Sequence, residues 1–188
     1  DYQERANGVP DEPEVDYTFA DALRDLGDAT PARRYSAAHH LANFWDIGDR
    51  DDDPQLNRAL EAIPVMIDCL ERHDEHTVSD AEALAGDLCL FASEGALTLA
   101  QANDAKGAME RCLGRARETL QTLEAAFAPI ANKAVPERVT MQSQIQDYRS
   151  LVEELGDKLG DWDDDLVLAS PGGGAGKKGK DKGGKGKK

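Results

Sequence analysis

Hydrophobic side chains recur at helical spacing along most of the chain, and the two most regular stripes lie in its second half. The first stripe runs through Met109, Leu113, Ala116, Leu120, Leu123 and Phe127. The second has the same 4-3-4-3-4 spacing through Met141, Ile145, Tyr148, Val152, Leu155 and Leu159. This spacing aligns the side chains on one helix face. Because a short loop bounded by Pro129 and Pro136 separates the stripes, they predict a long antiparallel helical hairpin.

The first half of the chain predicts shorter helices, each marked by a start or stop residue. The first begins after Asp16 as N-cap and closes at Gly27. The second covers residues 31–47, with Thr30 before Pro31 at its start and Gly48 at its end.

The central stretch from Pro54 to Phe91 predicts two more helices joined by a polar turn at 73–76. Asp53 is the expected N-cap of the first helix, and Pro64 inside it predicts a kink. The second helix continues to about Gly95. From Ala96 we expect the helix to continue to Ala102, with a tight turn at Asn103–Asp104. We therefore expect an all-α protein.

Composition divides the chain into three parts. Residues 1–15 carry few apolar side chains and predict a flexible acidic arm. Residues 16–165 form the predicted all-helical domain. Residues 166–188 are a Gly/Lys-rich basic tail that we expect to be disordered, because it has almost no apolar surface to bury.

The net charge of −15 hides a strong asymmetry, because seven of the ten lysines lie in the last twelve residues. Without those twelve, 15 Lys and Arg face 36 Asp and Glu, a charge of −21 for residues 1–176. Such a body repels phosphate groups. The composition is typical of halophilic proteins, with an ordinary acidic cytoplasmic protein as the alternative. No apolar run approaches the roughly 20 residues of a membrane span.

The three cysteines, Cys69, Cys89 and Cys112, lie among apolar neighbours without CxxC spacing. We expect them to be buried free thiols in a reducing compartment. This expectation, together with the absence of a membrane span, favours a cytoplasmic location.

The segment Ala62-Ile-Pro-Val-Met-Ile-Asp-Cys-Leu70 is similar to the first helix of a HEAT repeat, in which a proline precedes a run of aliphatic residues. The segment 31–44 resembles a HEAT second helix, with Arg33, Ala37 and Leu41 in the expected places. The resemblance covers about residues 17–92, although Ser79 stands where an arginine is usual. It implies two HEAT-like helix pairs before the hairpin, stacked as a solenoid or closed as a bundle.

A tetratricopeptide-like interpretation competes for residues 96–116, where 103–113 looks like a turn followed by a second helix. Both families are helical scaffolds that generally bind macromolecules, and neither implies catalysis. The resemblance therefore implies a non-enzymatic scaffold or adaptor that binds a protein partner through its helical surface.

Candidate sites for chemistry are sparse. The run Asp49–Asp53 has the first ligand positions of a calcium loop, but Pro54 replaces the turn glycine, so a capping loop is the favoured interpretation. His73 and His76 flank a turn that has no third ligand for zinc. His39 and His40 point in different directions around a helix, one toward the core and one toward solvent. The sequence predicts no catalytic, cofactor-binding or metal-binding residue and no enzyme activity.

The basic tail is the feature with the clearest functional implication. It contains a chance match to a phosphate loop around 174–181, in which Asp181 replaces the magnesium-binding hydroxyl. Nonspecific phosphate contacts are the alternative function, because the tail has no arginine or aromatic residue for base readout. The candidate contact residues are Lys177, Lys178, Lys180, Lys182, Lys185, Lys187 and Lys188.

Overall fold

The computed structural model describes residues 16–165, with side chains up to Trp162. Within this range the regular structure consists of six α-helices and two 3₁₀ segments, without a strand, so the predicted all-α fold is confirmed. The predicted flexible arm 1–15 and basic tail 166–188 lie outside the described residues.

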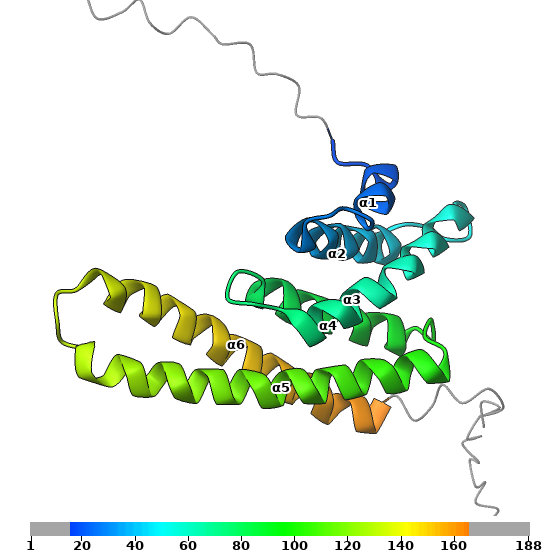
Figure 1. Cartoon of the computed structure of the whole chain (residues 1–188). Helices are drawn as coiled ribbons and strands as arrows, with labels where there is room; N and C mark the ends of the chain where they lie inside the picture. The colour runs from blue at the N-terminus through cyan, green and yellow to red at the C-terminus, as the bar shows by residue number, and fades with distance from the viewer. Residues whose placement is uncertain (1–15, 166–188) are drawn as a thin grey trace, which may run out of the picture.

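The helices stack in three layers along the chain, as Figure 1 shows. α1 packs on α2 in the first layer, α3 and α4 form the second, and α5 and α6 form the third. α3 contacts α5, and α4 contacts α6, which joins the second layer to the third. The bounds are α1 Phe19–Asp25, α2 Pro31–Ile47, η1 Pro54–Ala62, α3 Ile63–Arg72, α4 Val78–Ser93, α5 Leu99–Phe127, η2 Ala128–Ile130 and α6 Pro136–Asp165.

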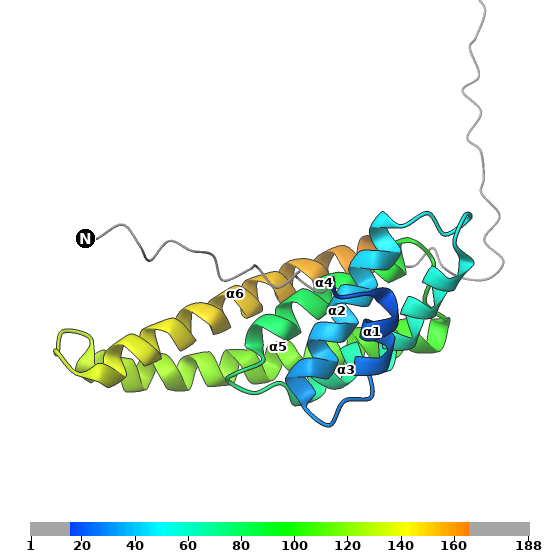
Figure 2. The same ribbon diagram turned by 90° about the horizontal axis from the view of Figure 1, so that it is seen from above.

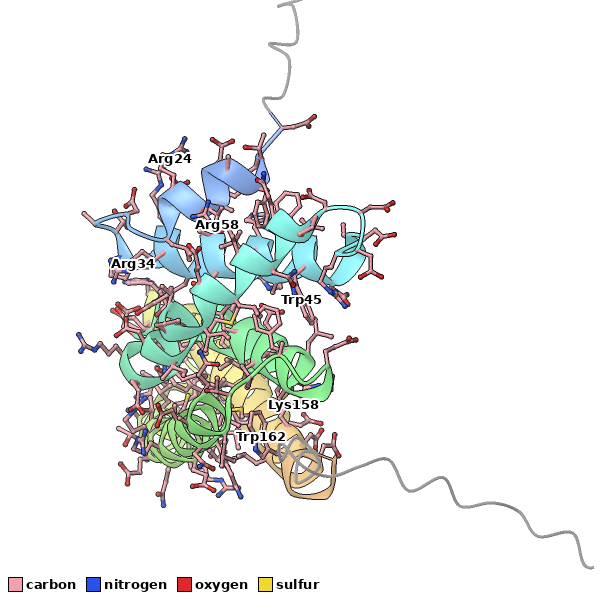
Figure 3. All side chains as sticks on the ribbon, turned by 90° about the vertical axis from the view of Figure 1, so that its right-hand side faces the viewer. Arg24, Arg34, Trp45, Arg58, Lys158 and Trp162 are labelled. Carbon is pink, nitrogen blue, oxygen red and sulfur yellow. The ribbon has the colours of Figure 1, made fainter. Side chains whose placement is uncertain are left out.

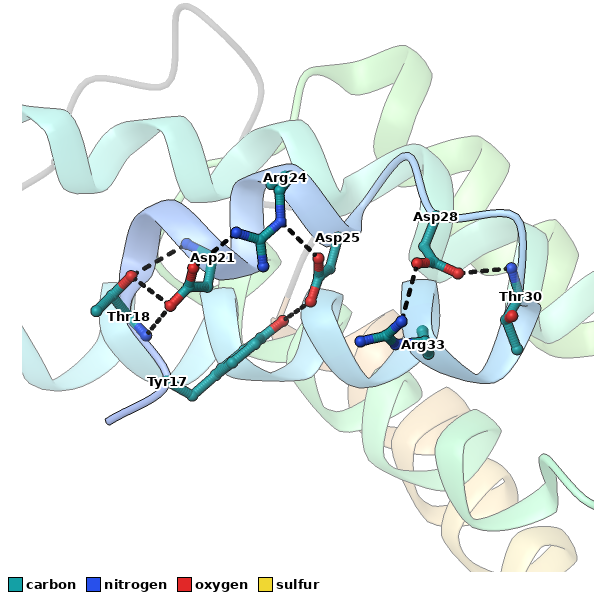
Figure 4. A network of polar contacts seen from close by, with 8 residues as sticks. All are labelled: Tyr17, Thr18, Asp21, Arg24, Asp25, Asp28, Thr30 and Arg33. Carbon is teal, nitrogen blue, oxygen red and sulfur yellow. Dashed lines mark hydrogen bonds and ion pairs between the residues drawn. The ribbon is translucent and has the colours of Figure 1, made fainter. Parts of the chain in front are cut away.

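The cap of α1 differs from the predicted one. Thr18, rather than Asp16, is the N-cap: its hydroxyl accepts from the backbone of Asp21, whose carboxylate accepts in turn from the backbone of Thr18 at 3.0 Å. This reciprocal capping box satisfies two amide groups that an Asp16 cap would leave unpaired. Figure 4 shows the box and the ion pairs of Arg24 and Arg33 beside it. α2 has the predicted bounds.

The helix predicted from Pro54 is divided in two. Asp53 is its N-cap, as expected, and accepts from the amide of Gln55 at 3.2 Å. Residues 54–62 are nevertheless a 3₁₀ segment, and α3 begins at Ile63. Pro64 explains the division, because it has no N–H to donate to the carbonyl of Leu60. The amide of Ile63 donates to that carbonyl instead, which is the 3₁₀ pattern.

α4 ends in a glycine cap. Gly95 has a φ of 71°, and the amide of Ala96 donates to the carbonyl of Phe91 at 2.8 Å. This is the left-handed cap that glycine adopts without steric cost. The cap breaks the helix that we expected to continue from Ala96 to Ala102, so that prediction is wrong.

α5 is a single helix of 29 residues, and the predicted turn at Asn103–Asp104 is wrong. A second capping box between Thr98 and Gln101 starts the helix just upstream. Asn and Asp cost less than about 0.7 kcal/mol each inside a helix, and the alanine, glutamine and lysine around them favour one. The helical hairpin of α5 and α6 is confirmed, and α6 continues past Gly160 to bury Trp162.

The core lies between the layers and is made mostly of Ala and Leu. In its upper part Trp45 meets Phe91 edge to face, with ring centroids 4.9 Å apart. Cys69 and Cys112 are fully buried and Cys89 is half-buried, all as free thiols. Figure 3 shows Trp45 and Trp162 at different levels of the stack. These layers set the position of the hairpin, on which the candidate site lies.

Candidate functional site

The seven lysines predicted to contact phosphate or a partner lie outside the described residues. They are Lys177, Lys178, Lys180, Lys182, Lys185, Lys187 and Lys188. Their role therefore stays a prediction from composition.

The turn between α3 and α4 separates its two histidines. His73 is half-buried, and its Nδ1 lies 3.4 Å from the carbonyl oxygen of Leu70 and 3.6 Å from the Sγ of Cys112. Burial lowers the pKa of His73 below its ordinary value. His76 is exposed beside Glu75. Across the described residues no three His, Cys, Asp or Glu side chains form a group that could hold a metal ion.

The acidic loop after α2 uses its carboxylates to organise its own backbone. One oxygen of Asp49 accepts from the amides of Asp51 and Asp52, at 3.0 and 3.2 Å. Asp53 caps the following segment. These are the bonds of a capping loop.

A polar pair that the sequence did not reveal joins α2 to α4. The Nδ1 of His39 lies 2.7 Å from the Oδ2 of Asp87, and Asp87 is 8 % exposed. Burial raises the pKa of Asp87, and the hydrogen bond from His39 partly offsets that effect. Of the two predicted orientations, His39 is therefore the inward one, and His40 is exposed. His39 and Asp87 are 48 positions apart in the sequence, too far for any local pattern to reveal the pairing.

A hollow of about 310 Å³ lies between the second half of α4 and the end of α6. Cys89, Lys158 and Trp162 line it, and Figure 3 shows the last two together near the end of α6. Burial raises the pKa of the Cys89 thiol to about 11, so the thiol is protonated at neutral pH. Since the thiolate is the reactive form, this hollow offers no activated nucleophile.

The outer half of the hairpin extends beyond the other helices, as Figures 1 and 2 both show. Ala116 is the last buried residue of α5, and Ile145 is the first buried residue of α6. No side chain between them is buried, and we call residues 117–144 the outer arm. Leu120, Leu123 and Phe127 belong to the same stripe as the buried Met109 and lie half-exposed.

The outer arm begins where the hydrogen bonds between the hairpin and the second layer end. Gln144 donates to Glu75 at 3.2 Å, and Ser150 donates to Glu82 of α4 at 2.9 Å. On the α5 side, Arg111 donates to Glu71 of α3 at 2.8 Å. Beyond Gln144 no described hydrogen bond joins the outer arm to the second layer, so its far end is held by contacts between α5 and α6.

The tip of the outer arm is apolar and uncovered. Residues 125–135 read Ala-Ala-Phe-Ala-Pro-Ile-Ala-Asn-Lys-Ala-Val, with Lys133 as the one charged residue, and none of them is buried. Just beyond, Val139 is 64 % exposed. Residues 35–45 carry no Asp, Glu, Lys or Arg, but many of their side chains are buried, so what distinguishes the tip is the exposure of a run of such low charge.

A groove of about 810 Å³ follows the hairpin from the tip toward its base. Its walls come from α5, η2 and α6. Phe127, Ala128 and Ile145 supply apolar surface, and Glu124 pairs with Arg149 across the hairpin at 2.7 Å. Val139 lies three residues before Gln142 of the groove wall and therefore extends the same face of α6.

The outer arm is electroneutral on an acidic molecule. Over residues 16–165, 14 Lys and Arg face 31 Asp and Glu, a formal charge of −17. The outer arm itself holds three basic and three acidic residues, so all the excess negative charge lies elsewhere. These six are Arg117, Glu118, Glu124, Lys133, Glu137 and Arg138.

Two further findings bear on identity. Among the described helices none combines the length and the apolar character needed to cross a lipid bilayer. A comparison of the chain with family models, curated proteins and solved structures gives no match in any of the three.

Proposed function

We propose that this chain is a non-enzymatic helical scaffold that binds another protein through its outer arm. The observation that supports this function is the uncovered apolar tip, residues 125–135 with Val139, on an otherwise acidic surface. Exposed apolar patches bordered by polar residues mark interaction sites on soluble proteins. The HEAT-like resemblance of residues 17–92 stays a prediction, and its expected role as a binding scaffold agrees with this proposal.

Charge supports the same surface. Interface cores are depleted of charged residues and contain aromatic and aliphatic anchors. Phe127 and Val139 are such anchors, and the outer arm lacks the net charge that the rest of the described chain carries. Cys112 and His73, by contrast, pack inside the helical layers, which supports a scaffold rather than a reactive cleft.

The proposal can be tested by photo-crosslinking in the native host. A photoreactive amino acid is placed at Val139 in the outer arm or at Ile47, which is 81 % exposed at the end of α2 and serves as a matched control. We expect protein cross-links from position 139 and few or none from position 47. Equal yields from both positions, or none from position 139, would refute the proposal.

A second candidate function, association with nucleic acid, is favoured by the composition of the tail alone. Seven lysines among glycines supply sequence-independent phosphate contacts, whereas the described body carries −17 and repels phosphate. Truncation before Pro171 should then abolish binding to a DNA or RNA duplex. Binding that survives this truncation, or that does not weaken with salt, would exclude the tail as its source.

A further inference from the structure

We propose that residues 166–168 of this chain, Leu-Val-Leu, occupy the hollow between α4 and α6 and close it over Cys89 and Trp162. These three residues lie outside the described range, directly after the end of α6 at Asp165. Figure 1 shows that this end of α6 is opposite the tip of the outer arm, so the contact goes beyond the proposed function and does not depend on it.

The hydrophobic stripe of α6 continues into this segment. Leu155, Leu159 and Trp162 follow one another at spacings of four and three, and Leu166 takes the next position, four residues after Trp162. Leu155 is fully buried and Trp162 is 6 % exposed, so the stripe faces the other helices. Since α6 runs to Asp165, the chain leaves the helix with Leu166 on the side where Trp162 lines the hollow.

The wall of the hollow on α4 has an apolar surface with free space above it. Cys89 and Leu90 line this wall together with Gly86. A Cβ atom added at Gly86 would meet nothing within 4 Å, so this part of the wall leaves room for incoming side chains. The volume of about 310 Å³ is at the lower limit of pockets that hold small ligands, and a few aliphatic side chains suffice to fill it.

The polar side chains of the hollow favour an aliphatic occupant over a charged one. The hydroxyl of Ser93 donates to the carbonyl of Leu90 at 2.8 Å, and Lys158 pairs with Glu154 at 3.6 Å. Lys158 and Asp161 bring one charge of each sign to the lining, so it selects neither an anion nor a cation. An aliphatic occupant keeps these bonds, whereas a polar ligand would have to replace them to avoid being buried without partners.

The short connection to α6 makes this segment the favoured occupant among aliphatic ones. Three residues span at most about 10 Å, at about 3.3 Å per residue, so Leu168 stays close to the end of α6 in any conformation. A contact within one chain has an effective concentration in the millimolar range, which a separate partner would have to exceed. The remaining tail has only alanine and proline as apolar residues, so its large aliphatic side chains are all at this place.

Thiol labelling of the full chain tests the contact, because Cys89 lines the hollow while Cys69 and Cys112 are fully buried inside the body. An aromatic disulfide reagent is added, and mass spectrometry identifies the cysteine that reacts. The variant Leu166→Ser/Val167→Ser/Leu168→Ser keeps the length and charge of the tail but removes its aliphatic side chains. We expect Cys89 to react at least about tenfold faster in this variant, because access to the thiol limits its reaction.

A matched control places three serines further along the same tail. The variant Gly172→Ser/Gly173→Ser/Gly174→Ser should label Cys89 at the rate of the unmodified chain. Equal Cys89 rates in all three chains would overturn the proposal. Cys89 that is open in all of them and becomes shielded only when a host protein is added would also overturn it, because the hollow then belongs to that partner.

Nuclear magnetic resonance of the unmodified chain provides a measurement that needs no variant. Nuclear Overhauser effects should connect the methyl groups of residues 166–168 with the indole ring of Trp162. Their absence would overturn the proposal. If Cys69 and Cys112 also become reactive in the Leu166→Ser/Val167→Ser/Leu168→Ser variant, the substitutions have loosened the whole body, and these effects in the unmodified chain decide the outcome.

Discussion

The His39–Asp87 pair between α2 and α4 gives the sharpest prediction about stability. The carboxylate of Asp87 is buried and has its Oδ2 2.7 Å from the Nδ1 of His39. His39→Ala removes the donor and leaves the carboxylate buried with one fewer hydrogen bond. A hydrogen bond to a charged group contributes about 1.5–3 kcal/mol. Because the His39 side chain is 42 % exposed, water compensates in part, and we expect a loss of about 1–2 kcal/mol at neutral pH.

The pH dependence of this loss has a definite sign. Burial raises the pKa of Asp87 above its ordinary 3.8, so the folded state binds more protons than the unfolded state in that range. Ionisation of the buried Asp87 carboxylate therefore destabilises the folded state increasingly as the pH rises past about 4. The hydrogen bond from His39 offsets part of this destabilisation. Asp46 adds to the raised pKa of Asp87. Burial also raises the pKa of Asp80, and His39 offsets part of that effect. The effect of His39→Ala should accordingly be largest at neutral pH and shrink as the pH falls through the raised pKa of Asp87, so that little of it remains at about pH 4.

A double-mutant cycle measures the pair directly. The chain, His39→Ala, Asp87→Asn and the double variant are unfolded in urea and followed by circular dichroism. The coupling energy should be about 1–2 kcal/mol at pH 7, within the usual range for contacting residues, and should fall as Asp87 protonates. Ser36→Ala is the control on the exposed side of α2 and should change little. A coupling below about 0.5 kcal/mol at pH 7, the usual limit of additivity, would refute the account of this pair.

Three further predictions concern the core, a buried histidine and the acidic surface. Phe91→Ala removes a fully buried ring packed on Trp45 and should cost about 3–5 kcal/mol in urea unfolding; a loss under about 1 kcal/mol would contradict the packing. Burial lowers the pKa of His73 below 6.5, so stability should fall as the pH drops below about 6.5, and His73→Leu should flatten that part of the pH profile. If stability still falls as steeply with decreasing pH in this variant, His73 is not the cause of the pH dependence. Raising KCl to about 1 M should raise the melting temperature, because salt screens the repulsion within the charge of −17 on residues 16–165. A lower melting temperature in KCl would show that this repulsion does not destabilise the folded state.

Much of the fold could be predicted because local signals agreed with the final structure. Pro31, Gly48, Asp53 and the two leucine-rich stripes each mark a boundary or a face that short-range geometry determines. The errors lie where neighbouring signals competed. The Asn103–Asp104 pair is typical of a turn, but the Thr98 capping box starts α5 before it.

The candidate site was less predictable, since burial depends on distant helices. The stripe from Met109 to Phe127 is regular throughout, yet only its first half is covered by the second layer. No spacing rule marks Ala116 as the last buried residue. The low charge of residues 125–135 did not distinguish them, because residues 35–45 carry no Asp, Glu, Lys or Arg and contain buried side chains. The exposure of the tip became evident only from the arrangement of the layers.

Hydrogen exchange of the full chain tests the central claim, that the outer arm is a contact surface, most directly. In dilute protein the amides of residues 117–144 should exchange faster than those of α3 and α4, because few buried contacts hold them. With the cross-linked partner identified in the host added, exchange should slow over residues 117–144 and along the groove toward Glu153. Slowing confined to α1–α4, or no change anywhere in the hairpin, would contradict the claim.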